Sequence, residues 1–185
     1  MSKFKRFLML LAILPLLAII PAGCAPTGGP SGAVAVYVTD PGPVSNITSI
    51  NITASAVQIH KAGDNGEEGK WISLPIDTAN STFDLIALRD GGLEQLLAQG
   101  NVTAGNYTQI RMVIEKPVEV TFDGQTQNAT VPSGELKFVR PFEVVDGNTT
   151  VLSLDFNAGK CVTITGAGEL IIHPVVTLNV TMRSS

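Results

Sequence analysis

Cysteine, histidine and tryptophan are scarce in this chain of 185 residues, which contains two, two and one of them. Two cysteines, Cys24 and Cys161, are too few for the disulfide framework of a small secreted scaffold. Two histidines, His60 and His173, leave hydrolytic triads and zinc sites without their usual base and ligands, and either is better interpreted as a surface or capping residue. The sequence also lacks the patterns His-x-x-x-His, Cys-x-x-Cys, Gly-x-Ser-x-Gly and a phosphate-binding Gly-rich loop with lysine. We therefore expect no catalytic residues, no metal and no cofactor.

Basic residues are also few, at 12 against 16 acidic ones. Lys3, Lys5 and Arg6 stand at the very start, and no acidic residue precedes position 24, so removal of residues 1–23 leaves nine basic and 16 acidic side chains, a net charge of −7. An acidic domain without a basic cluster argues against a nucleic-acid partner and against electrostatic docking on anionic lipid.

The first 24 residues carry the most informative pattern. A basic start is followed by the apolar run Phe7 to Ile20 and by Ala22-Gly23-Cys24. This order predicts a signal peptide over residues 1–23 and a lipid on Cys24. Pro21 stands where a lipoprotein signal usually has Leu, Val or Ile, so an ordinary signal peptide cut elsewhere and an uncleaved anchor remain alternatives. The apolar run of roughly 14 residues is short of the ~20 that span a bilayer.

Three segments follow from this pattern: a signal peptide (1–23), a lipidated cysteine with a flexible Gly-, Pro- and Ser-rich tether (24–32), and a folded domain (33–183). We expect an exported protein at the cell surface or the outer face of the membrane, held there by its N-terminal lipid. The membrane would then be one partner, and an envelope protein or polysaccharide another.

Asparagine is unusually placed, because eight of the ten asparagines stand in Asn-x-Ser/Thr. Threonine-rich strands produce some such triplets by chance, but eight is more than composition explains. The pattern indicates N-glycosylation of an exported protein and favours an archaeal source. The candidate sites are Asn46, Asn51, Asn80, Asn101, Asn106, Asn128, Asn148 and Asn179.

Apolar and polar residues alternate from end to end of the folded part, which is typical of half-buried strands. Gly, Pro and Asp punctuate most of the gaps. The Leu93, Leu96 and Leu97 spacing predicts one helical segment over Gly92 to Gln99. The strands are expected over Ala33–Thr39, Ile50–His60, Trp71–Leu74, Thr82–Leu88, Tyr107–Glu115, Val118–Phe122, Leu136–Val139, Phe142–Val145, Thr150–Phe156, Cys161–Thr165 and Leu170–Met182.

About ten short strands and one short helix predict an all-β, Greek-key sandwich of the immunoglobulin or transthyretin type. Ala104-Gly105-Asn106-Tyr107 supports this, because a Gly two residues before a Tyr that opens a strand is typical of a tyrosine corner. Tyr107 is therefore expected to have an architectural role.

Several motifs along the chain resemble those of the domain of unknown function family 4382, whose members are exported bacterial and archaeal proteins, often behind a lipoprotein signal. The motifs are Ala35 to Asp40, Phe83 to Gly91, Ala104 to Arg111, Val131 to Gly134, Leu152 to Phe156 and Ile172 to Val175. The resemblance covers roughly Gly32 to Thr181, departs from the family pattern at Asn157 and Cys161, and implies a sandwich at the cell surface without implying an activity.

Asp84, Arg111 and Asp155 form the best polar constellation, because each lies in an expected strand between residues that must be buried. They are interpreted as an Arg–carboxylate pairing that locks neighbouring strands, in preference to a ligand-binding cluster. Cys161, on an expected strand, is interpreted as an unreactive thiol rather than a nucleophile. Turns at Gly63 to Glu68 and at Asp146 to Asn148 are oxygen-rich but lack the spacing of a known calcium loop.

The leading hypothesis is therefore a non-catalytic, lipid-anchored surface sandwich with a structural or partner-binding role. A carbohydrate- or calcium-binding module is an alternative. An exported hydrolase that uses Asp84 and Asp155 as a carboxylate pair is a less favoured one, since such pairs must face one cleft.

Overall fold

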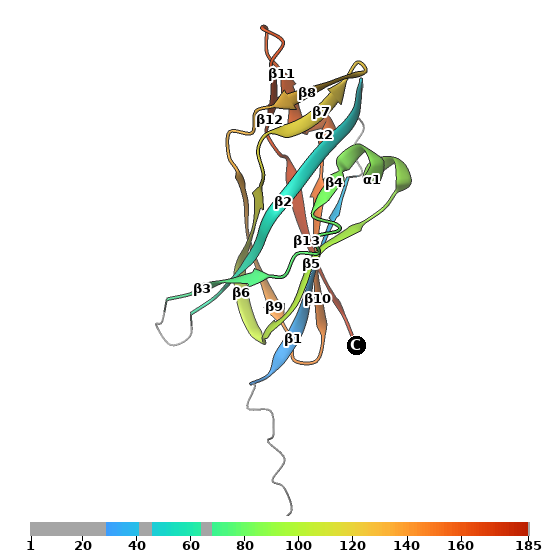
Figure 1. Ribbon diagram of the computed structural model, residues 1–185. Coiled ribbons are helices and arrows are strands. Elements are labelled where there is room, and N and C mark those ends of the chain that lie inside the picture. The colour runs from blue at the N-terminus through green and yellow to red at the C-terminus, as the bar shows by residue number, and fades with distance from the viewer. Residues whose placement is uncertain (1–28, 41–45, 64–67, 185) are drawn as a thin grey trace, which may run out of the picture.

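The computed structural model describes residues 29–40, 46–63 and 68–184, and this part of the chain forms the predicted all-β sandwich (Figure 1). One sheet contains four strands in the order β13-β10-β1-β5. Its central strand β1 pairs with β10 in parallel and with β5 in the antiparallel sense. The bounds of these strands are β1 (Ser31–Thr39), β5 (Gln95–Thr103), β10 (Thr149–Phe156) and β13 (Val176–Arg183).

The second sheet is built around the long strand β2 (Ile47–Lys61), in the order β8-β7-β2-β6-β9. The first half of β2 pairs with β7 and with β4, and its second half pairs with β6 and with β3. A separate hairpin joins β11 (Val162–Ile164) to β12 (Leu170–Ile172). The remaining strands are β3 (Lys70–Leu74), β4 (Thr82–Asp84), β6 (Gly105–Ile114), β7 (Val118–Phe122), β8 (Gln125–Ala129) and β9 (Glu135–Val144).

The core lies between the two sheets and is filled by every second residue of the central strands. Val34, Val36 and Val38 of β1 are completely buried, and so are Leu152 and Leu154 of β10. On the opposite sheet, Ile50, Ile52 and Ile59 of β2 and Ile110 and Met112 of β6 are at most 1% exposed. This period of two places polar residues of the same strands on the outer faces.

The one expected helix is in the wrong place. A helix, α1 (Leu85–Gly91), interrupts the strand that was expected over Thr82–Leu88, and the segment that was expected to be helical, Gly92 to Gln99, leads into β5. The Asp84 carboxylate caps the helix by accepting a hydrogen bond from Ile86 N at 2.9 Å. Gly92 ends it in the left-handed conformation, at φ 59°. Two local signals, an Asp N-cap and a Gly C-cap, thus outweigh the short alternation.

Other differences concern strand boundaries. β1 begins at Ser31, so two residues assigned to the tether belong to the sandwich. β9 runs without a break through Pro141, where two strands were expected. The expected last strand is divided at His173-Pro174 into β12 and β13, because proline cannot donate to a ladder. Cys161 ends a short helix, α2 (Ala158–Cys161), instead of starting a strand. β5 and β8 were not expected at all.

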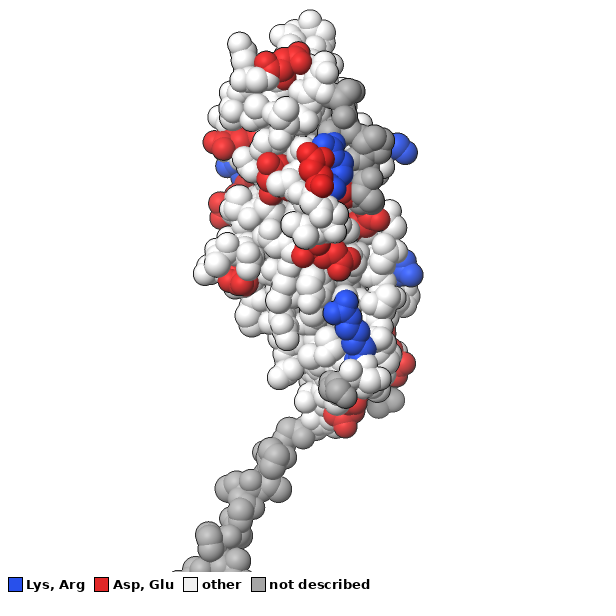
Figure 2. All heavy atoms as spheres, turned by 90° about the vertical axis from the view of Figure 1, so that its right-hand side faces the viewer, with Lys and Arg blue, Asp and Glu red and all other residues white. Residues whose placement is uncertain are grey.

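The first strand begins at one end of the sandwich. Figure 1 shows the start of β1 at the lower end, while the β7–β8 and β11–β12 hairpins lie at the upper end. The face turned towards α1 is scattered with acidic side chains, with fewer basic ones (Figure 2). Within the described ranges, no helix has the length and apolar character needed to cross a membrane.

Candidate functional site

Asp84, Arg111 and Asp155 do not form a cluster, contrary to the sequence prediction. Asp84 lies at the end of β4 in the sheet of β2, whereas Asp155 lies in β10 of the other sheet. Phe83 and Phe156, the neighbours of the two aspartates, meet across the core with ring centroids 5.9 Å apart. Because side chains alternate along a strand, the two carboxylates are directed away from each other.

Each of the three residues has its own surroundings. The Asp84 carboxylate accepts hydrogen bonds from Ile50 N and Ile86 N, at 3.0 and 2.9 Å, and so ties α1 to β2. Asp155 lies opposite Thr39 of β1 and Thr177 of β13, and desolvation by burial raises its pKa. The arrangement removes the structural basis for a hydrolase that uses Asp84 and Asp155 as a pair, since both would have to face one cleft.

Arg111 instead belongs to the outer face of the β2 sheet. Its Nε donates to the Gln58 side chain, and its guanidinium lies 3.8 Å from the Glu135 carboxylate and 4.1 Å from the centre of the Trp71 ring. The sequence pattern singles out Arg111, but it does not indicate Trp71 as its neighbour. The signal was the alternation around Trp71, which places it on the same face as the polar residues of β2.

Tyr107 is completely buried at the start of β6. Its phenolic O–H donates to the Thr103 carbonyl oxygen at 2.8 Å, an upstream backbone group, as in a tyrosine corner. The ring stacks on Phe142 of β9, with centroids 5.3 Å apart and planes 14° apart. Gly105, at φ 137°, occupies a backbone conformation that other residues rarely adopt and lets the chain turn from β5 into β6.

Cys161 is 1% exposed and has no disulfide within the described ranges. Val175 N donates to its sulfur at 3.3 Å. Desolvation by burial is the largest influence on the thiol, and it raises its pKa. A buried thiol with a raised pKa is a poor nucleophile, which agrees with the unreactive role inferred from the sequence. Cys24 lies outside the described residues.

None of the eight candidate glycosylation asparagines is buried. Asn46, Asn101, Asn106, Asn128 and Asn179 are exposed, and Asn51, Asn80 and Asn148 are partly exposed. Their positions in strands and turns are therefore compatible with modification of the folded surface. The side-chain amide of Asn80, the group that a glycan would modify, donates from Nδ2 to Asp77 Oδ2 at 2.6 Å.

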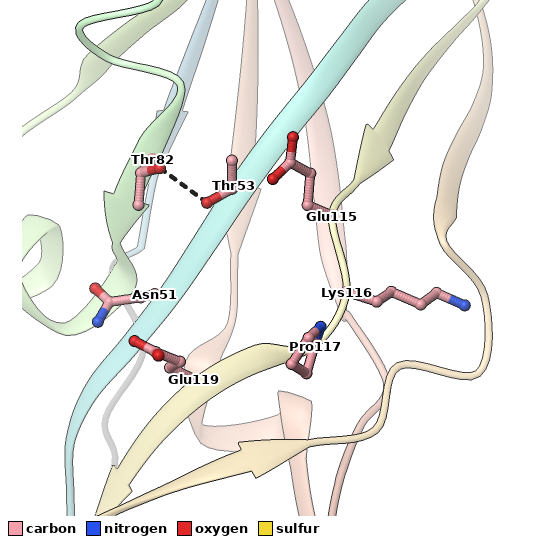
Figure 3. Close-up of a pocket in the computed structure, with 7 residues that line it drawn as sticks. All are labelled: Asn51, Thr53, Thr82, Glu115, Lys116, Pro117 and Glu119. Carbon is pink, nitrogen blue, oxygen red and sulfur yellow. Dashed lines mark hydrogen bonds between the residues drawn. The ribbon is translucent and has the colours of Figure 1, made fainter.

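A polar hollow of about 520 Å³ lies where β2, β4 and β7 meet (Figure 3). Asn51 is paired with Glu119 across the strands, and the Thr53 and Thr82 hydroxyls are hydrogen-bonded at 2.8 Å. Glu115 and Glu119 place two carboxylates in the wall of this hollow, and Figure 3 shows the Lys116 side chain pointing away from both of them. Lys116 and Pro117, which are joined by a cis peptide bond, also line a second hollow of about 560 Å³ next to Asn128.

Neither hollow contains a metal-binding cluster among the described residues. Within the described ranges, no group of three or more His, Cys, Asp or Glu side chains could hold a metal ion. Of the two oxygen-rich turns, Gly63 to Glu68 lies partly outside the described residues. In the other, Asp146 Oδ1 accepts a hydrogen bond from Ser31 N at 2.8 Å, so the carboxylate fixes the start of β1.

Comparison with known families gives one match. The model of the family described as domain of unknown function (DUF4382) matches residues 31–174, which is most of the chain. The chain belongs to the DUF4382 family. The matched region begins at the first residue of β1 and contains all of the sandwich except β13. No curated protein and no solved structure matches the chain.

Proposed function

We propose that this DUF4382 protein is an exported, lipid-tethered domain of the cell surface that binds a partner in the envelope and does not catalyse a reaction. The N-terminal 24 residues motivate export and lipidation, as argued from their charge and apolar pattern. The two aspartates that a hydrolase would need lie in different sheets, and the Asp84 carboxylate is used to cap α1 and to accept from Ile50 N.

The position of β1 is the observation that carries the proposal. A tether that follows Cys24 would enter the domain at Ser31, and β1 is hydrogen-bonded on both sides, to β10 and to β5. Such a strand cannot be peeled from an edge when the tether is pulled, because both ladders must break together. An anchor attached there suits a domain that is held at a membrane while its outer surface engages a partner.

Glycosylation is a second part of the proposal. Asn51 and Asn128 each line one of the two hollows beside Pro117, so the first sugars of glycans on these residues would lie against protein surface. Mass spectrometry of tryptic peptides from the native membrane fraction tests this part: glycan masses on Asn51, Asn128 or the other candidates support it, and bare asparagines throughout contradict it.

Replacement of Cys24 tests the anchor. We expect Cys24→Ser to move the protein from the membrane fraction to the soluble exported fraction, because the variant has no sulfur to which the lipid can be attached. The matched control is Cys161→Ser, which changes the other cysteine and should leave the protein in the membrane fraction. Membrane retention of a Cys24→Ser protein from which residues 1–23 have been removed would contradict lipid anchoring.

A further inference from the structure

The outer face of the second sheet has a regular pattern of side chains over β3, β2, β6 and β9. The labels of β3 and β6 mark this part of the sheet at the lower left of Figure 1. The strand registers place Ser73, Gln58, Arg111 and Lys137 in one row, from β3 through β2 and β6 to β9. The next row consists of Trp71, His60, Gln109 and Val139. We call these eight residues the Trp71 face.

Trp71 stands on the edge strand β3, and three other side chains of this face meet its ring. The Arg111 guanidinium lies 4.1 Å and the Lys137 ammonium 5.5 Å from the centre of its ring, and the His60 ring meets it edge-on at 5.0 Å. Cation–π contacts of this kind contribute roughly 0.5–1 kcal/mol each at exposed sites. They hold two cationic groups beside an aromatic surface that is itself partly exposed.

Several groups of the Trp71 face lack a partner within the described protein. Arg111 has a long contact with Glu135, but Lys137 forms no ion pair with any described residue. Gln109 Oε1 is buried and accepts no hydrogen bond from the described protein. Val139 is 75% exposed, in the same row as Trp71. A purely structural ladder of cross-strand pairs would pair its charges and cover its apolar members.

Charge complementarity identifies the chemistry of the partner. The two rows contain two permanent cations, and Glu135, 3.8 Å from Arg111, borders them, on a domain whose basic residues are outnumbered nine to 16 beyond residue 23. The His60 ring packs closely against Gly69 and is hydrogen-bonded to Thr108 Oγ1 at 2.9 Å, so the charges that can meet an anion are Lys137 and the Arg111 nitrogens that Gln58 does not use. An anionic partner would be attracted here and repelled by the acidic surface elsewhere.

We propose that the Trp71 face binds an acidic polysaccharide, with carboxylated sugar units held by Lys137 and Arg111 and one sugar ring lying against Trp71. The inference rests on the proposed function for its setting in the envelope and adds the partner's chemistry. In line with the cations, Gln58 donates to Ser73 Oγ and accepts from Arg111 Nε, and these hydrogen bonds hold the row in place beside the aromatic surface. An extended chain of acidic sugars presents carboxylates to the cations and C–H faces to the exposed part of the Trp71 ring.

Trp71 is the only tryptophan of the protein, so its fluorescence reports on this face alone. The full-length protein in mild detergent is titrated with polygalacturonate at low and high salt. We expect a saturable change of Trp71 fluorescence that weakens at high salt, as ionic contacts are screened. Lys137→Gln should weaken the apparent affinity about tenfold or more, a loss of roughly 1.4 kcal/mol.

The matched control is Lys160→Gln, which removes the same charge from an exposed lysine of α2, outside this face. An equal loss in both variants would mean non-specific attraction and would overturn the proposal. Equal binding of neutral dextran or of poly-glutamate would overturn the acidic-sugar assignment, the second in favour of an acidic peptide. Absence of any fluorescence change or binding would also overturn it, while leaving the Cys24→Ser result, and thus the proposed anchoring, unaffected.

Discussion

At the scale of single residues, Tyr107 shows how one hydroxyl fixes a corner of the sandwich. We expect Tyr107→Phe to lower the free energy of unfolding by about 1 kcal/mol, because the hydrogen bond to the Thr103 carbonyl is lost while the stacked ring on Phe142 remains. Urea denaturation followed by circular dichroism measures the change. Tyr37→Phe, at the other tyrosine, removes a partly exposed hydroxyl and should change stability by less than roughly 0.5 kcal/mol. Equal losses in both variants would contradict the corner's role.

Cys161 gives the stability of the protein a dependence on alkaline pH. Burial raises its pKa in the folded state, so the thiol's contribution is fully present below the ordinary thiol pKa of 9.0 that applies to the unfolded chain. As the pH rises further, the unfolded chain releases the proton first, and the free energy of unfolding falls until the folded thiol ionises too. Cys161→Ser cannot titrate in this range, so denaturation between pH 8 and 10 should show a shallower decline for the variant. Parallel declines would contradict burial of the thiol.

At the scale of elements, the left-handed end of α1 is a second test of local structure. Gly92→Ala meets no atom within 4 Å, so its cost is that of a side chain at φ 59°, about 1 kcal/mol. Gly166→Ala is the matched control, because it also has open space but no positive φ, and it should be neutral or slightly stabilising. Urea denaturation of the two variants measures the difference, and equal stabilities would mean that Gly92 does not end the helix in this conformation.

The same helix shows what the sequence could and could not predict. Strands with a buried face, such as β1, β2, β6, β7 and β10, were located because alternation is a local signal. α1 was missed because Phe83 and Leu85 alternate with Asp84 for too short a distance to distinguish a strand from a capped helix. The leucines after Gly92 have helical spacing, yet Leu96 and Leu97 belong to β5, which pairs with β1, and Leu97 is completely buried. Leu93 precedes the strand and is exposed.

The candidate site was less predictable than the fold, because it depends on strand register. Arg111 was recognised as a buried-strand charge, but its partners come from β2, β3 and β9, which are up to 53 residues away in sequence. The aspartates were assigned to it because all three occupy polar positions between apolar ones. Alternation says that such a residue faces outward, but it does not say from which of the two sheets, and that choice separates Asp84 from Asp155.

At the scale of the whole molecule, the central position of β1 makes the first strand indispensable. Its Val34, Val36 and Val38 are completely buried, and their burial contributes about 5 kcal/mol or more, comparable to the whole stability of a typical domain. Removal of β1 would also leave two sheet edges, on β10 and on β5, without a partner. The edge strand β13 has one buried residue, Leu178, at 5% exposure, and pairs on one side with β10.

Two truncations distinguish these roles. A chain without residues 1–39 should fail to fold, whereas a chain that ends at Pro174, before β13, should fold with reduced stability, because it loses an edge strand and keeps the centre of the sheet. A chain without residues 1–28 is the control for loss of the signal and tether alone, and it should unfold in urea at the same midpoint as the protein purified after signal removal. Circular dichroism and urea denaturation of the three chains measure this order. If the chain without β1 unfolded cooperatively, like the one without β13, force on the tether would not be borne by the core, and the anchoring argument would lose its structural basis.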